Sequence, residues 1–278
     1  MKSTKELTSA QKWERATLAD NFIFCKVMTA NPDLCRELLE KMLGMEIERV
    51  EQPRADHSLK SDYGLNGIRF DVYVKDGTGR CLDVEMQTTN RRDLAHRELA
   101  RRTRGYQSLM DVDSSPCDVD YDDLNDGYVI FLCLDDPFGK GLPVYTFESV
   151  CVGDKSIPLG DGTYKIFYNA AKHAVMPNET LKSFFSFLAG SADGSALSDR
   201  LATVVEYAKS NTQWKLQFMA WEDEIKFRAK EVCEESAVET ARKLLGMGKL
   251  SEQDIAEATG LPLAQVEQLR QESSTVKA

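Results

Sequence analysis

The sequence predicts an α/β protein: a mixed central sheet flanked by helices, followed by an all-helical C-terminal region. Two segments indicate the sheet. Residues 68–87 alternate apolar and polar side chains with a period of two, and residues 128–134 form a continuous apolar run typical of a strand buried on both faces. From Asn178 onward, apolar residues recur at helical spacing instead. We expect a sheet domain over 1–175, a helical region with one long helix over 176–245, and a helix-turn-helix-like tail over 246–278.

The composition is that of an ordinary globular protein, with 42% hydrophobic and 29% charged residues among 278. The seven cysteines are scattered without a C-x-x-C pair, which favours reduced thiols over a disulfide framework or a zinc site. No segment resembles a signal peptide, and no stretch approaches 18 apolar residues. We therefore expect a cytoplasmic protein that does not span a membrane.

The formal net charge of −10 disfavours a protein that binds nucleic acid over its whole surface. Affinity for phosphate comes largely from Lys and Arg. Any contact with DNA must therefore be local, and it should be sensitive to salt.

Residues 68–87 are predicted to form a β-hairpin. Phe70, Val72 and Val74 alternate with polar residues on the first strand, and the second strand, 81–87, alternates in the same way. The four residues between the strands, Asp76 to Gly79, have the composition of a turn.

The hairpin brings acidic side chains together. If Lys75 pairs with Cys81, Asp71 lies opposite Glu85, and a register tighter by two residues places Asp71 opposite Asp83 instead. Opposed like charges are destabilising, so a divalent cation is the simplest compensating group. The alternative interpretation is a solvated polar face of an antiparallel sheet, which requires no function.

Two helices are expected before the hairpin, over Asp20 to Leu43, with a break at Asn31-Pro32 and an end at Gly44. After them we expect a short strand over 47–52 and then a polar loop over 53–67. The loop contains His57, which we expect to be solvated.

An arginine-rich helix is predicted after the hairpin. Ala95, Leu99, Thr103, Tyr106 and Met110 form one stripe, and the helix carries Arg97, Arg101, Arg102 and Arg104, three of which (97, 101 and 104) fall on the opposite face. These arginines are either a solvated helix face or a clamp for phosphate, whose geometry guanidinium groups match.

The remaining elements follow from turns and periodicity. We expect strands over 128–134, 143–150 and 163–169, and helices over 181–188, 197–209 and 214–245. In the tail, Ser251 is a candidate cap and Gly260 a turn residue. Its second helix carries few basic residues, so packing or oligomerisation is an alternative to reading DNA.

Five blocks occur in this order along the sequence: Asn21–Gly44, Arg69–Asp76, Asp83–Gln87, Arg101–Asp111 and Tyr128–Glu148. Together they resemble the Rpn family of recombination-promoting nucleases, whose members also carry the label transposase, within the PD-(D/E)XK nuclease superfamily. The chain departs from the wider superfamily at Gln87, where Lys is typical. A role that needs a cationic side chain at this position therefore does not transfer.

The resemblance implies a restriction-endonuclease-like fold and a metal-dependent DNA endonuclease. It implies a catalytic set of Asp71, Glu85 and Gln87, with Mg²⁺ or Mn²⁺ held by Asp71 and Glu85 and helped by Asp83 or a helix acid such as Asp20, Glu37 or Glu40. Arg97, Arg101, Arg102 and Arg104 are the expected phosphate-binding residues, and Tyr106 and Glu37 are expected to support the site. The expected partners are DNA and a second copy of the chain, through the C-terminal helices.

Two other functions remain open from the residues alone. One is a catalytically weak DNA-binding or scaffolding protein that keeps the nuclease fold and works through its tail. Gln87 and the negative net charge of the chain favour this alternative. The other is a purely structural sheet with an exposed acidic face.

Overall fold

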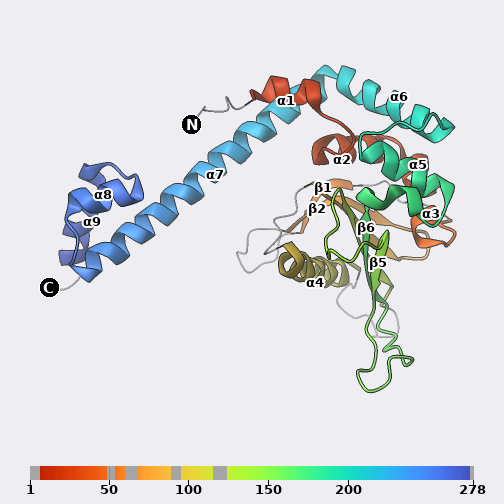
Figure 1. Ribbon diagram of the computed structural model, residues 1–278, viewed down its shortest axis with the longest axis horizontal. Coiled ribbons are helices and arrows are strands. Elements are labelled where there is room, and N and C mark those ends of the chain that lie inside the picture. Colours follow the sequence, from red (N-terminus) through yellow and green to blue (C-terminus); the bar gives the residue numbers. More distant parts are fainter. Residues whose placement is uncertain are drawn as a thin grey trace. The chain divides into compact units, whose positions relative to one another are not determined.

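The computed structural model describes residues 7–48, 50, 54–59, 68–88, 95–114 and 124–275 (Figure 1). The chain divides into two compact units. Glu14–Trp214 form one, the sheet unit, and Met1–Trp13 with Lys215–Ala278 form the other, the helical unit. The three-part division expected at residues 175 and 245 stays a prediction.

The sheet unit is built on a mixed sheet of six strands in the described part of the chain, in the order β1-β2-β3-β4-β6-β5. The β1/β2, β2/β3 and β5/β6 pairs are antiparallel, whereas β3/β4 and β4/β6 are parallel. The strands are β1 (Arg54–Leu59), β2 (Ile68–Lys75), β3 (Cys81–Gln87), β4 (Gly127–Cys133), β5 (Val144–Phe147) and β6 (Thr163–Asn169). The expectation of a mixed sheet flanked by helices is confirmed.

The hairpin of β2 and β3 adopts the first of the two predicted registers, in which Lys75 lies opposite Cys81. Its turn is held by the Asp76 carboxylate, which accepts hydrogen bonds from the backbone N–H groups of Thr78 (2.9 Å) and Arg80 (3.0 Å). Gly79 has φ of 89°, a conformation that residues with a β-carbon rarely adopt. The turn therefore fixes the register that opposes the two acids.

The polar loop predicted over 53–67 is wrong in part, because Arg54–Leu59 form strand β1 at the edge of the sheet. His57 accordingly lies in a strand, with its Cα paired to that of Phe70. Pairing with β2 gives the backbone N–H and C=O groups of β1 their hydrogen bonds. This stabilisation does not require alternating apolar side chains, which the β1 sequence RADHSL lacks. Of the strand expected over 47–52, the described residues show one isolated bridge, Val50 to Asp76.

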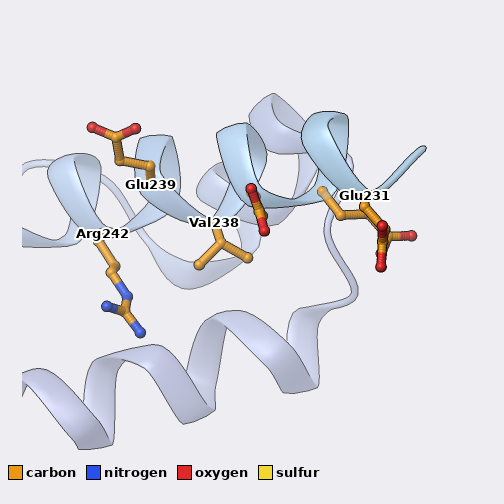
Figure 2. A pocket seen from close by; sticks show the side chains of 6 residues that line it. Glu231, Val238, Glu239 and Arg242 are labelled. Carbon is orange, nitrogen blue, oxygen red and sulfur yellow. The ribbon is translucent and has the colours of Figure 1, made fainter. Parts of the chain in front are cut away.

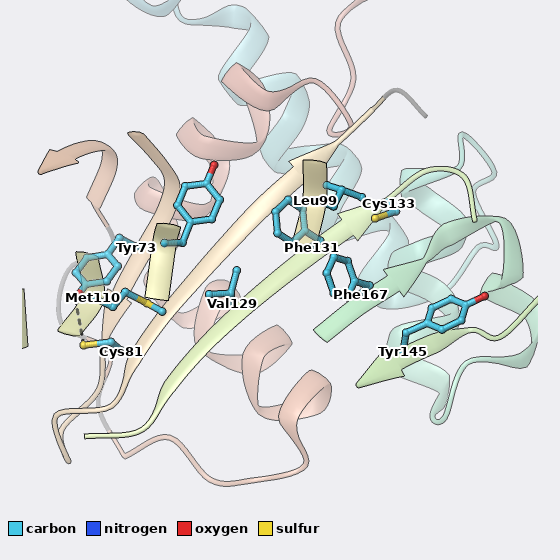
Figure 3. Packing of buried hydrophobic residues seen from close by; sticks show 10 residues of the cluster. Tyr73, Cys81, Leu99, Met110, Val129, Phe131, Cys133, Tyr145 and Phe167 are labelled. Atoms are coloured by element: carbon cyan, nitrogen blue, oxygen red, sulfur yellow. Dashed lines mark hydrogen bonds between the residues drawn. The ribbon is translucent and has the colours of Figure 1, made fainter. Parts of the chain in front are cut away.

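Helix α4 (Ala95–Ser114) covers one face of the sheet. Odd-numbered strand residues, among them Val129, Phe131 and Phe167, pack beneath it with Leu99 and Met110 (Figure 3). The predicted stripe of α4 is confirmed from Leu99 to Met110, since its four members there are at most 5% exposed.

The opposite face is covered by α2 (Asn21–Ala30), α3 (Pro32–Leu43) and α5 (Glu179–Leu188), as Figure 1 shows. Even-numbered residues such as Val72 and Val84 line this second layer with Phe24 and Phe184. The predicted helix pair is confirmed, with Gly44 left-handed at its end. The Asn31 side chain, however, donates to the carbonyl of Val27 and does not cap α3.

The other helices among the described residues that were predicted occur in the predicted order. They are α6 (Ala196–Ser210), α7 (Thr212–Met247), α8 (Glu252–Thr259) and α9 (Leu263–Thr275). The short 3-10 helix η2 (Ala170–Val175) was not predicted. Ser251 forms a capping box with Asp254, and Gly260 is left-handed between α8 and α9, so the predicted cap and turn are confirmed. Helix α1 (Ser9–Arg15) was not predicted.

Apolar side chains of the helical unit pack together near both ends of α7. Trp13 of α1 packs on Phe218 of α7, with ring centroids 5.3 Å apart. The far end of α7 packs through Ala241 against Ile255 of α8 and Val266 of α9. None of the described helices is long and apolar enough to cross a membrane, and the six cysteines among the described residues are free.

Candidate functional site

Three acids from the hairpin, Asp71, Asp83 and Glu85, lie on the face of the sheet that α4 covers, and we call them the acid cluster. The register pairs Tyr73 with Asp83, so its continuation places Asp71 opposite Glu85. The exposed fractions are 7% for Asp71, 0% for Asp83 and 1% for Glu85. The alternatives that treat this as a solvated or exposed acidic face are therefore wrong, because all three carboxyl groups are buried.

Backbone hydrogen bonds fix the two opposed acids. Glu85 Oε1 accepts from the N–H of Asp71 at 3.0 Å, and Asp71 Oδ2 accepts from the N–H of Met86 at 3.0 Å. From α2, Asn21 Nδ2 donates to Asp71 Oδ1 at 2.7 Å. Each carboxyl group is thus positioned by the neighbouring strand, which leaves it little freedom to rotate.

Arg102 of α4 supplies positive charge to the cluster. Its Nη2 donates to Glu85 Oε2 at 2.7 Å, and its Nη1 donates to Gln87 Oε1 at 2.9 Å. Tyr106, one turn further along α4, donates its hydroxyl to the same Glu85 oxygen at 2.8 Å. The guanidinium also lies 5.1 Å from the ring centroid of Phe131, a favourable cation–π position.

Asp83 has no such partners. Neither of its carboxyl oxygens has a hydrogen-bond partner among the described residues. Burial, followed by the negative charges of Glu85 and Asp71, raises the pKa of Asp83 well above its usual range. An unpartnered buried carboxylate is costly, so this group must bind a proton or a cation.

Glu85 is affected in the same direction. Burial and the charge of Asp71 raise its pKa from 4.5 to about 7, although Arg102 opposes the shift. Near neutral pH the cluster therefore holds protons that carboxyl groups in water would have lost. Metal binding would have to displace them, since carboxylate ligands must be deprotonated.

The arginines expected to act together are divided by the structure. Arg102 belongs to the acid cluster, whereas Arg97, Arg101 and Arg104 are exposed. None of these three pairs with a carboxylate among the described residues. The family resemblance implied one role for all four, whereas the helix pattern already separated Arg102, which lies three residues from Leu99 and four from Tyr106, at the edge of the buried stripe.

The acids proposed to help from the first helices each have another partner in the structure, so their part in the site stays a prediction. Glu37 pairs with Arg200 at 2.7 Å, Glu40 accepts from the N–H of Ile47, and Asp20 accepts from the N–H of Thr17. The α2 residue that donates to the Asp71 carboxylate is Asn21, and Cys25 of the same helix donates its thiol to the Asp71 carbonyl oxygen. Asn21 was missed because only acids were considered.

The donor set of the cluster suits a hard cation by its chemistry, since every candidate ligand atom is an oxygen. Within the described ranges, however, no group of three or more His, Cys, Asp or Glu side chains is arranged to hold a metal ion. The oxygens of Glu85 already accept from Arg102, Tyr106 and the backbone. Asp83 is the acid whose two oxygens are left for a cation or a proton.

The fold and site define a mixed α/β protein in which, among the residues the structure describes, three buried carboxyl groups lie with one guanidinium. Comparison of the chain with protein-family models, with curated proteins and with solved structures gives no match.

Proposed function

We propose that the protein is a metal-dependent DNA endonuclease of the Rpn type, with a restriction-endonuclease-like fold, that hydrolyses phosphodiester bonds. By resemblance, the activity serves DNA recombination or mobile elements. The observation that carries the proposal is the excess of buried acid over base among the described side chains: Asp71, Asp83 and Glu85 lie together there with one cation, Arg102.

The balance of charge explains why this observation points to a divalent cation. Three ionised carboxylates and one guanidinium leave a net charge of about −2 in a buried place, where unbalanced charge is strongly unfavourable. Protons can remove that charge, as the raised pKa values of Glu85 and Asp83 indicate. A divalent cation removes it equally well, and Mg²⁺ or Mn²⁺ matches the oxygen ligands.

In this proposal Asp71 and Glu85 hold the metal, and Asp83 assists them. Two carboxylates suffice for Mg²⁺, which often keeps several waters and binds substrate phosphate directly. A cation held by these residues would supply Lewis-acid polarisation of the scissile phosphate and would lower the pKa of a bound water.

The side chains around the acids have distinct roles. Gln87 orients the attacking water by hydrogen bonding, because an amide cannot act as a base. Its carbonyl oxygen accepts from Arg102, so the orientation of its amide is set before substrate binds. Arg102 offsets the charge that develops on the phosphate in the transition state, and Arg104 binds phosphate further along the DNA backbone. Tyr106 positions Glu85.

One observation favours a second function, a nuclease fold that binds DNA or scaffolds other proteins without cutting. Arg102 already balances the charge of Glu85 and donates to the side-chain oxygen of Gln87. Part of the site is therefore taken up by hydrogen bonds within the protein. In this case the helical unit carries the function. Helix α7 exposes Leu216 and Val232, each more than 60% exposed, which is consistent with self-association through this helix.

The test is plasmid cleavage by the wild type and by the Asp71→Ala and Glu85→Ala variants, with Mg²⁺, with Mn²⁺ and with EDTA, at two salt concentrations. The control is Asp154→Asn, which removes an exposed carboxylate from a surface turn. We expect metal-dependent nicking or linearisation in the wild type and the control, and none in the two variants. Absence of cleavage from folded wild-type protein under every condition would favour the scaffolding function instead.

A further inference from the structure

A groove lies beside α4, between this helix and strands β5 and β6, and we call it the α4–β6 groove. Its volume is about 520 Å³, within the range of ligand sites in proteins. The residues that line it are Ala100, Thr103, Arg104, Gln107, Ser108, Asp111, Phe138, Phe147, Lys165 and Phe167.

Three aromatic rings form one wall. Phe138 lies 5.1 Å from both Phe147 and Phe167, centroid to centroid, and the last two are 5.8 Å apart and nearly perpendicular. Phe167 is 2% exposed, so it is a fixed support, whereas Phe147 is 44% exposed. An exposed ring on a rigid aromatic base is suited to stacking against a flat ligand.

The polar residues of the groove carry two cations. Neither Arg104 nor Lys165 forms an ion pair in the described part of the chain, and Lys165 Nζ donates to Thr163 Oγ1 at 2.7 Å. Gln107 is 7% exposed, and its Oε1 has no partner among the described residues, while its Nε2 donates to Asp111. Aromatic surface beside available cations is the combination by which proteins hold single-stranded nucleic acid.

A second groove in the chain shows that this combination is not a general property of its surface. That groove, of about 480 Å³, runs along α7 and is lined by Val238, Arg242 and four glutamates (Figure 2). Arg242 is already paired with Glu272. Such a surface repels phosphate, so charge distinguishes the two grooves.

The α4–β6 groove lies close to the acid cluster along the sheet. Glu85 is in register with Phe131 on β4, which is in register with Phe167 on β6. Two strand spacings separate Glu85 from Phe167, which is about 10 Å. A base bound in the groove would therefore belong to a nucleotide near a phosphate at the acid cluster.

We propose that the α4–β6 groove binds an unstacked nucleobase of the DNA substrate, with the base against Phe147 and the adjoining phosphates on Arg104 and Lys165. The inference rests on the proposed nuclease function and specifies its substrate as single-stranded or locally unpaired DNA. A base inside a duplex is not available to such a groove, because it must first leave the stack.

The test measures binding of a fluorescent single-stranded oligonucleotide and of the matching duplex by fluorescence anisotropy. EDTA is present, so that binding is measured without cleavage. The variants are Phe147→Ala and Lys165→Ala. Phe227→Ala, which also removes an exposed phenylalanine, and Lys155→Ala, which removes an exposed lysine, are the matched controls. Thermal melting of each variant establishes that it is folded.

We expect the wild type to bind the single strand more tightly than the duplex. Phe147→Ala should weaken single-strand binding about tenfold, within the range for loss of one base–aromatic stack, without changing the dependence on salt. Lys165→Ala should reduce the slope of log affinity against log salt by about 0.7, the value for one single-strand phosphate contact. The controls should bind like the wild type.

Two outcomes overturn the inference: equal affinity for single strand and duplex, or Phe147→Ala binding like its control Phe227→Ala. If Asp71→Ala abolishes cleavage while Phe147→Ala keeps full single-strand affinity, the nuclease proposal stands and the groove proposal fails. If the groove variants lose binding while no metal supports cleavage, the groove proposal stands and the nuclease proposal fails.

Discussion

Replacing Arg102 with methionine tests whether this residue balances the charge of the acid cluster. Arg102 donates to Glu85 and to Gln87, and its side chain is 33% exposed, whereas that of Glu85 is 1% exposed. Removing one partner of a buried ion pair costs about 3–5 kcal/mol. Because the guanidinium is partly solvated, we expect the lower end, about 3 kcal/mol at pH 8.

The matched control is Arg101→Met, which removes an arginine from the next position of the same helix. Arg101 is exposed and has no ion pair among the described residues, so its loss should change stability by less than about 0.5 kcal/mol. Both variants are compared with the wild type by urea unfolding, with far-ultraviolet circular dichroism as the readout. Equal m values are required before shifts in the midpoint are compared.

The dependence on pH sharpens the test. Since the pKa of Glu85 in the folded protein is about 7, its carboxyl group is largely protonated at pH 5 even in the wild type. At pH 5, Arg102→Met therefore loses hydrogen bonds to a neutral group, which contribute about 1 kcal/mol. Equal losses for Arg101→Met and Arg102→Met, or a loss for Arg102→Met that is the same at pH 5 and pH 8, would refute the reasoning.

Three further predictions concern the acids of the hairpin. Because folding raises the pKa of Glu85 from 4.5 to about 7, the stability of the wild type without metal should fall as pH rises between these values. Protons compete with Mg²⁺ for the same carboxylates, so the rise in melting temperature caused by Mg²⁺ should be larger at pH 8 than at pH 6. Asp83→Asn should raise the free energy of unfolding at pH 8 by about 1 kcal/mol, because the Asp83 carboxyl oxygens are buried without hydrogen-bond partners among the described residues. Asp71→Asn should lower it by about 2 kcal/mol, because the new amide NH₂ group would face the N–H of Met86, another donor. Urea unfolding in EDTA measures both changes. Asp76→Ala should cost about 2 kcal/mol above pH 5, and the cost should shrink at lower pH. Burial tends to raise the pKa of Asp76, but hydrogen bonds from Thr78 and Arg80 outweigh it and lower this pKa. A cost that is constant from pH 3 to pH 8 would contradict this.

The hairpin could be predicted from the sequence because several local signals agree there. The alternation of β2 and β3 fixes which side chains share a face, and the Asp76–Gly79 turn limits the register to two alternatives. The structure selects the register that opposes Lys75 with Cys81. The burial of the acids could not be predicted, because burial depends on α4, a helix that joins the hairpin only in the tertiary fold.

Strand β1 and the role of Asn21 were missed for different reasons. An edge strand gains its stability from backbone pairing with β2, so the side chains of RADHSL carry little signal. Asn21 was missed because the search for ligands considered charge, whereas Asp71 is held there by a neutral amide donor at 2.7 Å. Hydrogen bonding fixes a carboxylate as well as charge does, and it adds nothing to the charge imbalance.

Helix α4 connects the acid cluster to the α4–β6 groove, and its periodicity explains how one helix serves both. Arg102 and Arg104 are two positions apart, so their side chains leave the helix in directions that differ by roughly 200°. One arginine therefore meets Glu85, and the other lines the groove beside Lys165. Tyr106 and Gln107 repeat the division one turn later, since Tyr106 donates to Glu85 while Gln107 lines the groove. A single helix thus sets the separation between the acids that would cut DNA and the rings that would hold its base.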